Sequence, residues 1–176
     1  ETEGVATAIR EHYLPRFAGD DLPGTLAGAL VAVADRVDSI ATCFRVGAIP
    51  TGSKDPLALR RQAIGLLKIL AQRAWNGVTV HSLVGDQAPA IQAQILDFVR
   101  ERFHGILTSE YDVPADFANA VLQNVGEAMK PIDQIAMAVA LRDFAATTDG
   151  FRDFLDNVFK RVLNILKQAD EKLPGW

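Results

Sequence analysis

The sequence has a single cysteine, three histidines and no long hydrophobic run. With Cys43 as its only thiol, the chain of 176 residues forms neither an internal disulfide nor a multi-cysteine zinc site. His12, His81 and His104 each lack a second histidine or a cysteine three to five residues away, so no metal-ligand pair arises. No apolar run approaches the ~20 residues that span a bilayer. Disulfide scaffolds, zinc modules and membrane-spanning helices are therefore excluded.

Catalytic motifs are also missing. The glycines of residues 47–52 have neither the spacing nor the Lys-Ser/Thr ending of a phosphate-binding loop, and no serine sits in a nucleophile elbow. Asp35 and Asp38, three residues apart on one expected helix, are weak candidates for a metal site, because two carboxylates leave a divalent cation under-coordinated. We expect no catalytic residue, and no metal or cofactor held by this chain.

What the sequence does contain is helical periodicity. Apolar residues recur at three or four positions in almost every segment, which predicts an all-α fold of two packed helical groups. The first group is expected over residues 1–76 and the second over 88–176. Between them, 77–87 combines glycines with β-branched residues and is either extended or a short helix. Helices are expected over residues 2–13, 24–44, 55–75, 88–109, 112–124, 132–146 and 149–169.

The charge is unevenly distributed along the chain. The net charge is −4, yet residues 54–73 contain one acid and a basic block made of Lys54, Arg60, Arg61, Lys68 and Arg73. Such a block can meet phosphates even on an acidic protein, because charges interact over a Debye length of only ~8–10 Å. Two plainer interpretations remain open. The cations form the solvated face of a helix, or Asp55 forms ion pairs with Arg60 and Arg61 that fix the loop at 50–54.

Three stretches together resemble the β subunit of bacterial heterotetrameric glycyl-tRNA synthetases. They lie in that family's order and cover most of the chain. The first is EHYLPRFAGDDLP at 11–23, which leads into ALVAVADRVDSI at 29–40. The other two are PTGSKDPLALRRQAIGLLKIL at 50–70 and KRVLNILKQADEKL at 160–173.

The resemblance implies an excerpt of a longer chain, in agreement with Glu1 as the first residue. Residues 1–76 would be the C-terminal part of an HD-like helical domain, and 88–176 would lead into an anticodon-binding-type region. The ADRVD motif matches the helix on which HD phosphohydrolases place their last metal-binding aspartate, at Asp35. The histidine and His-Asp ligands of those enzymes are absent here, so an HD-type phosphohydrolase fragment is only the alternative.

The resemblance further implies a subunit of glycine–tRNA ligase that binds tRNA(Gly) and the α subunit in the cytoplasm, with neither DNA nor a membrane as partner. ATP and Mg²⁺ would be used at the α subunit, and this chain alone would be inactive. A purely structural helical scaffold is a further alternative. The tRNA-binding candidates are Lys54, Arg60, Arg61 and Lys68, with a second contact from Lys160, Arg161 and Lys167.

Overall fold

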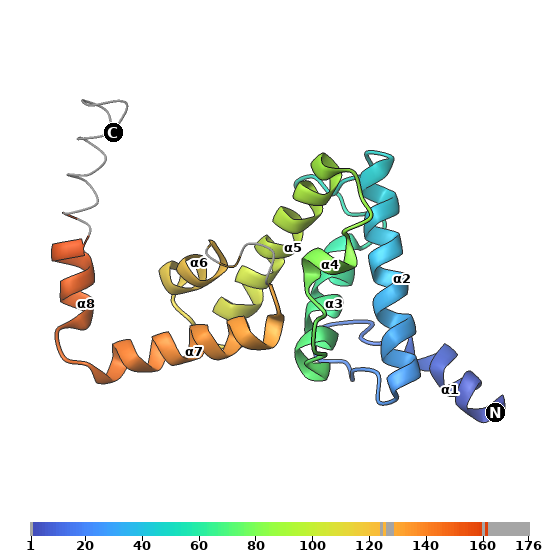
Figure 1. Cartoon of the computed structure of the whole chain (residues 1–176), viewed down its shortest axis with the longest axis horizontal. Helices are drawn as coiled ribbons and strands as arrows, with labels where there is room; N and C mark the ends of the chain where they lie inside the picture. The colour runs from blue at the N-terminus through green and yellow to red at the C-terminus, as the bar shows by residue number, and fades with distance from the viewer. Residues whose placement is uncertain (1, 124, 126–128, 160, 162–176) are drawn as a thin grey trace. The chain divides into compact units, whose positions relative to one another are not determined.

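The computed structural model describes residues 2–123, 125, 129–159 and 161, and every regular element within them is a helix (Figure 1). The all-α prediction is confirmed. In this part of the chain no helix is long and apolar enough to cross a membrane. The helices are α1 (Thr2–Glu11), α2 (Leu26–Arg45), α3 (Leu59–Arg73), α4 (Val80–Leu83), α5 (Pro89–Glu110), α6 (Ala115–Gln123), α7 (Pro131–Thr147) and α8 (Phe151–Asp153), which continues as a π-helix over Phe154–Phe159.

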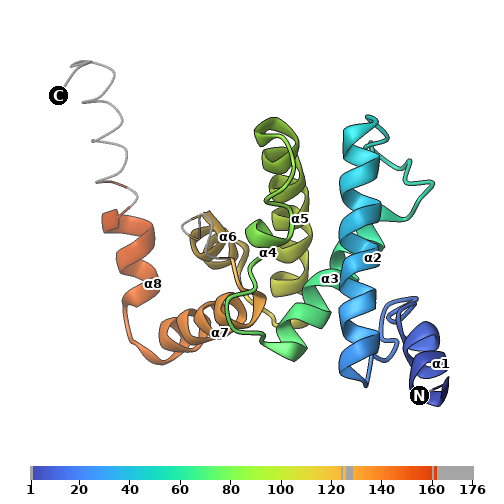
Figure 2. The ribbon, with the colours of Figure 1, turned by 45° about the vertical axis from the view of Figure 1, so that its right-hand side comes forward.

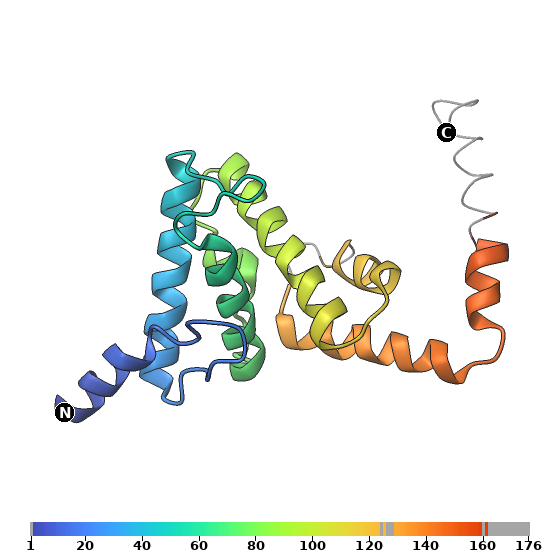
Figure 3. The same cartoon turned by 180° about the vertical axis from the view of Figure 1, so that it is seen from behind.

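The chain divides into two compact units, Glu1–Ala138 and Val139–Trp176. In the first unit α2, α3 and α5 pack against one another, while α1 contacts α2 and α6 contacts α5 (Figure 2). The loop between α1 and α2 lies against α3 (Figure 3). Contacts between α3 and α5 thus join helices on either side of residues 77–87. The division into 1–76 and 88–176 stays a prediction.

Helix α2 turns its small residues toward the core. Ala29 and Ala32 are completely buried and Ile40 nearly so, which lets the neighbouring helices approach closely. The periodicity predicts Leu26 and Leu30 on this buried face, and that prediction is wrong, because they are 57% and 51% exposed. The face that packs is set by the alanines, and the two leucines lie to one side of it.

Large apolar side chains of α3 and α5 complete the core. Phe44 of α2 meets Phe98 of α5 edge-on, with ring centroids 5.3 Å apart, an arrangement that aromatic pairs favour. The fully buried side chains of these two helices include Leu59, Leu66, Leu67, Ile69, Ile95, Val99, Phe103 and Leu107. This core is the rigid support on which the loops described below are mounted.

The segment whose conformation the sequence leaves open contains the short helix α4. The Thr79 side chain accepts a hydrogen bond from the Ser82 amide at 3.0 Å, and the Ser82 hydroxyl accepts one from the Thr79 amide at 3.0 Å. This reciprocal pair is a capping box. The Val80 amide also donates to the Met129 carbonyl at 3.0 Å. Local capping therefore selects the helical alternative despite the β-branched residues.

In the second unit, the end of α7 and the start of α8 meet through two aromatic rings. Phe144 and Phe151 lie edge to face with their centroids 5.1 Å apart. Of the helix expected over 149–169, α8 and the π-helical turn account for 151–159, while residues 160 and 162–169 lie outside the described residues.

Candidate nucleic-acid interface

The start of α3 is held by one carboxylate. Asp55 Oδ1 accepts a hydrogen bond from the Leu59 amide at 2.8 Å, and Oδ2 accepts one from the Arg60 amide at 3.0 Å. These are two of the N–H groups that have no partner within the helix, and a carboxylate here also interacts favourably with the helix dipole. Ala58, directly before the helix, has the left-handed conformation with φ 52°. The sequence predicts a cap by Ser53 or Asp55, and Asp55 provides it.

The turn before this helix is tied to it by Arg60. Thr51 and Lys54 exchange two backbone hydrogen bonds, of 3.1 and 2.8 Å, and Arg60 Nη2 donates to the Gly52 carbonyl at 2.7 Å. One interpretation of the sequence expects Asp55, Arg60 and Arg61 to fix this loop through ion pairs. Asp55 and Arg60 do fix it, but through backbone groups, and among the described residues no ion pair joins the three.

The five cations of the basic block have different environments. Lys68 Nζ forms an ion pair with Glu110 Oε1 at 2.8 Å, and Arg73 Nη2 donates to the carbonyls of Pro23 and Thr25 at 2.5 and 3.1 Å. With Arg60 bound to the turn, three of the five are engaged inside the fold. Lys54 and Arg61 are exposed, and within the described part of the chain neither side chain has a hydrogen bond or an ion pair.

The second predicted contact falls largely outside the described residues. Lys160 and Lys167 belong to the part of the chain whose structure is not described. Arg161 lies in the second unit and is exposed. Its contribution to tRNA binding stays a prediction.

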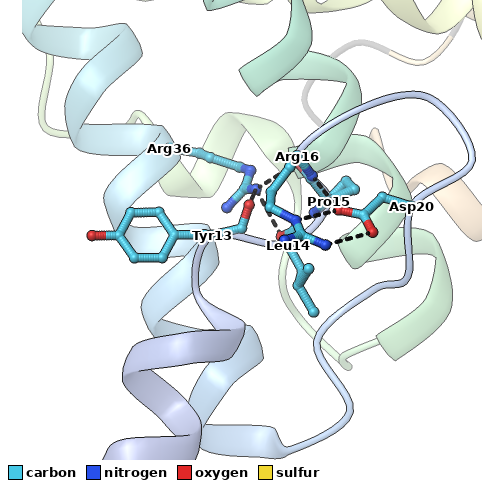
Figure 4. A network of polar contacts seen from close by, with 6 residues as sticks. All are labelled: Tyr13, Leu14, Pro15, Arg16, Asp20 and Arg36. Atoms are coloured by element: carbon cyan, nitrogen blue, oxygen red, sulfur yellow. Dashed lines mark hydrogen bonds and ion pairs between the residues drawn. The ribbon is translucent and has the colours of Figure 1, made fainter.

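The loop between α1 and α2 is anchored by a buried arginine. Arg36 of α2 is only 5% exposed. Its guanidinium donates to the carbonyls of Tyr13 at 3.3 Å, Leu14 at 2.7 Å and Pro15 at 3.3 Å (Figure 4). It also donates to the carbonyls of His12 at 2.9 Å and of Ala32, in its own helix, at 3.0 Å. Burial lowers the pKa of Arg36, while Asp35 acts in the opposite direction. Carbonyl dipoles thus take the place of water around this cation.

The ADRVD motif directs attention to its aspartate, Asp35, and does not identify Arg36, the next residue, as important. A signal was present, because position 36 falls in register with the buried Ala29, Ala32, Val33 and Ile40. A charged residue at a core position of an amphipathic helix indicates a buried polar partner. Here the partner is main chain rather than a carboxylate.

A glycine on α3 makes room for this anchor. A Cβ atom placed on Gly65 would lie 2.8 Å from Arg36 Nε and 3.3 Å from the Cγ and Cδ atoms of Pro15. A Cβ atom does not approach another heavy atom as closely as 2.8 Å, so any larger residue would displace the guanidinium or the loop. The absence of a side chain at position 65 is therefore part of the Arg36 anchor.

At its other end the loop caps α2. Glu11 Oε2 accepts hydrogen bonds from the Thr25 amide at 2.8 Å and the Thr25 hydroxyl at 2.5 Å, and Thr25 Oγ1 accepts from the Gly28 amide at 3.0 Å. Hydrogen bonds from Thr25 lower the pKa of Glu11. A Cβ atom on Gly28 would collide with the Glu11 side chain, so this close approach also requires glycine.

Within the loop, Asp20 binds Arg16 three times. The Arg16 amide and Nε donate to Asp20 Oδ2 at 2.8 and 2.9 Å, and Nη2 donates to Oδ1 at 3.3 Å (Figure 4). The Arg16 hydrogen bonds lower the pKa of Asp20 to about 2, and the same pair raises the pKa of Arg16. The loop over 11–23 is thus fixed at its start, middle and end.

The lowered pKa of Asp20 predicts a pH dependence of stability. The pKa is about 2 in the folded state against 3.8 without partners, so the ionised carboxylate stabilises the fold above about pH 4, and this contribution is lost as the pH falls toward 2. We expect the difference in Tm between the wild type and Asp20→Asn to shrink from about pH 5 to about pH 2. A difference that stays constant over this range would contradict the pairing.

A cavity of about 350 Å³ opens where this loop meets α2 and α3. We call it the Tyr13 cavity; its polar and aromatic lining comes from His12, Tyr13, Arg16, Asp35, Arg61 and Gln62, with Arg36 also in its wall. A neighbouring cavity of about 370 Å³ shares Pro15 and Arg61 with it and is lined by Phe17 and Lys68 on its own side. Arg61, which with Lys54 is one of the two exposed cations of the basic block, therefore lines both cavities.

The weak metal candidates do not converge. Asp35 lines the Tyr13 cavity, whereas Asp38 lines a different cavity with Leu30, Trp75 and Leu83. Both side chains are exposed. Over residues 2–123, 125, 129–159 and 161, no group of three histidine, cysteine or acidic side chains is placed to hold a metal ion.

Comparisons with known proteins agree with the motifs. The sequence profile of the family described as "Glycyl-tRNA synthetase beta subunit" matches residues 1–123. A glycine–tRNA ligase beta subunit of Syntrophotalea carbinolica is 41% identical over 95% of this chain and 25% of its own length. The same subunit of Bacillus subtilis is 38% identical over 96% of this chain and 24% of its own length.

The similarity extends over nearly the whole chain in other bacteria as well. The glycine–tRNA ligase beta subunit of Pseudomonas aeruginosa strain LESB58 is 39% identical over 99% of this chain. The chain spans about a quarter of the length of the curated relatives it matches. On the profile match and these identities, the chain belongs to the glycyl-tRNA synthetase beta subunit family.

Proposed function

We propose that this chain acts as part of a glycine–tRNA ligase, where it binds the phosphate backbone of tRNA(Gly) through Lys54 and Arg61 and contributes to subunit architecture. The observation that carries the proposal is that these two cations of the basic block are exposed and not engaged by other described residues. Lysine and arginine contacts to phosphates supply affinity and position without reading sequence. The relatives' names support the ligase assignment.

The division of labour follows from the family resemblance. By that resemblance, the aminoacylation chemistry, with its ATP and Mg²⁺, would belong to the partner α subunit. Arg60 and Lys68 would act indirectly, by fixing the turn at 51–54 and by pairing with Glu110. The phosphohydrolase alternative is not favoured, because Asp35 and Asp38 line separate cavities.

The proposal predicts a change in salt dependence. In the assembled synthetase, replacing both Lys54 and Arg61 with alanine should weaken tRNA binding and reduce the slope of log Kd against log salt concentration by about two, one for each lost phosphate contact. The measurement is a filter-binding or fluorescence titration at several salt concentrations. Because both side chains are exposed, folding should be unaffected.

Arg45→Ala is the matched control, since Arg45 is exposed on α2 and its guanidinium bonds only the Thr42 hydroxyl, at 2.7 Å, among the described residues. It should leave the slope unchanged. An unaltered slope and affinity in the Lys54 and Arg61 double variant would refute backbone binding by this surface.

A scaffold role is the second candidate and has its own support. Leu26, Leu30 and Val31 expose large apolar side chains at the start of α2. Leu26 and Leu30 lie one helical turn apart on α2, and contiguous exposed apolar side chains mark contact surfaces. Other parts of the synthetase would cover these side chains. This role is compatible with tRNA binding by Lys54 and Arg61 at the start of α3.

A further inference from the structure

We propose that the Tyr13 cavity binds one unpaired nucleotide of the tRNA, with the base stacked on Tyr13 and its phosphate held by Arg61. This inference rests on the proposed function and deepens it, because it assigns a defined RNA element to a defined cavity. It is carried by the combination of an exposed aromatic ring, an exposed arginine and a preformed cavity.

The ring is presented by a fixed backbone. The Tyr13 side chain is 63% exposed, whereas its carbonyl accepts a hydrogen bond from buried Arg36 at 3.3 Å. The His12 ring lies next to it, with centroids 3.9 Å apart and the ring planes tilted by 41°. In Figure 4 the ring points away from the Arg16–Asp20 pair. Anchoring the backbone lowers the conformational entropy that the loop loses on binding, and an exposed aromatic ring can stack with any of the four bases.

The charges and size of the cavity fit a nucleotide. Arg16, Arg36 and Arg61 line the cavity together with one carboxylate, Asp35. Arg16 is paired with Asp20, and Arg36 with main-chain carbonyls. Arg61 is therefore the cation available to a phosphate, and the exposed Asp35 carboxylate can accept a hydrogen bond from a base amino group. The volume of about 350 Å³ is near the lower end for small-ligand sites, which is enough for one base with its sugar.

The nucleotide must be unpaired. A base inside a duplex is stacked on both faces and presents only its edges, so its face is inaccessible to Tyr13. Gln62 adds a further point of contact, because its Oε1 atom is buried with no hydrogen-bond partner in the described part of the chain, while its Nε2 donates to the Leu57 carbonyl at 3.1 Å. A ligand that donates a hydrogen bond to this unpaired oxygen would remove the energetic cost of leaving it buried without a partner.

The test is tRNA binding by the assembled synthetase carrying Tyr13→Ala, Tyr13→Phe or Phe17→Ala. Tyr13→Ala should weaken binding about tenfold with an unchanged salt slope, since stacking releases no counterions. Tyr13→Phe keeps the ring and should bind like the wild type. Phe17 is the matched control: it is 58% exposed on the same loop, but it lines the neighbouring cavity and Arg16 lies 5.7 Å from its ring centre.

A second readout tests whether the bound element is single-stranded. In the Tyr13→Trp variant the fluorescence of the new indole should be quenched by tRNA but not by a blunt RNA duplex. Three results would each overturn the inference: tRNA affinity of Tyr13→Ala equal to that of the wild type, a loss of affinity in Tyr13→Phe as large as in Tyr13→Ala, or equal quenching by the duplex. If the Lys54 and Arg61 double variant shows the reduced salt slope while Tyr13→Ala binds tRNA like the wild type, only the inference that a base stacks on Tyr13 is refuted. If neither variant affects binding, the proposed function fails as well.

Discussion

Replacing Arg36 with alanine should destabilise the fold by about 3 kcal/mol, because the carbonyls of residues 12–15 would lose their donors while the loop stays packed on α2 and α3. Hydrogen bonds from a charged donor are among the stronger ones, and water can replace them only in part at carbonyls that are partly or fully buried. Urea unfolding followed by far-ultraviolet circular dichroism measures the change as a lower midpoint at an unchanged slope.

Two further variants show whether the loss comes from the guanidinium. Arg36→Lys keeps the charge but not the planar fork, so it should recover only part of the stability. Arg45→Ala removes an exposed arginine from the same helix and should change the free energy of unfolding by less than about 0.5 kcal/mol. Equal effects at positions 36 and 45 would show that the loop is not anchored as described.

Replacing Gly65 with alanine should cost about 2 kcal/mol, although alanine favours helix over glycine by up to about 1 kcal/mol. The new Cβ atom would lie 2.8 Å from Arg36 Nε. That side chain cannot move aside without breaking its hydrogen bonds to the loop. Thermal unfolding measures the effect as a lower Tm.

Gly105 of α5 provides a control of opposite sign. A Cβ atom there meets nothing within 4 Å, so Gly105→Ala should stabilise the fold by about 0.5–1 kcal/mol through helix propensity alone. If Gly65→Ala also stabilised the protein, the close approach of α3 to the Arg36 anchor would be refuted.

Helix positions follow from the sequence because periodicity and capping are local. The apolar spacing and the cap at Asp55 predict α2, α3 and α5 to within a few residues, since both signals depend on neighbours along the chain. The short helix α4 is less clear, because its β-branched residues favour extended backbone while its capping box favours helix.

The site could be predicted only in part, because its important contacts are between distant residues. Pairing of Lys68 with Glu110 joins two helices and cannot be read from either of them. The same applies to Arg36, whose partners in the loop lie more than twenty positions away. A charged side chain in a helical pattern normally indicates a solvated face, and only the packed fold shows which cations remain exposed.

The arginine anchor also determines how the loop over 12–20 can move. Four of the five carbonyls that Arg36 holds belong to the loop, whereas Arg36 itself is part of the core helix α2. Local opening of the loop therefore requires rupture of contacts that reach into the core, so loop and helix form one cooperative unit. The backbone of residues 12–15, which carries the exposed Tyr13 ring, is therefore expected to open only together with contacts of the core helix.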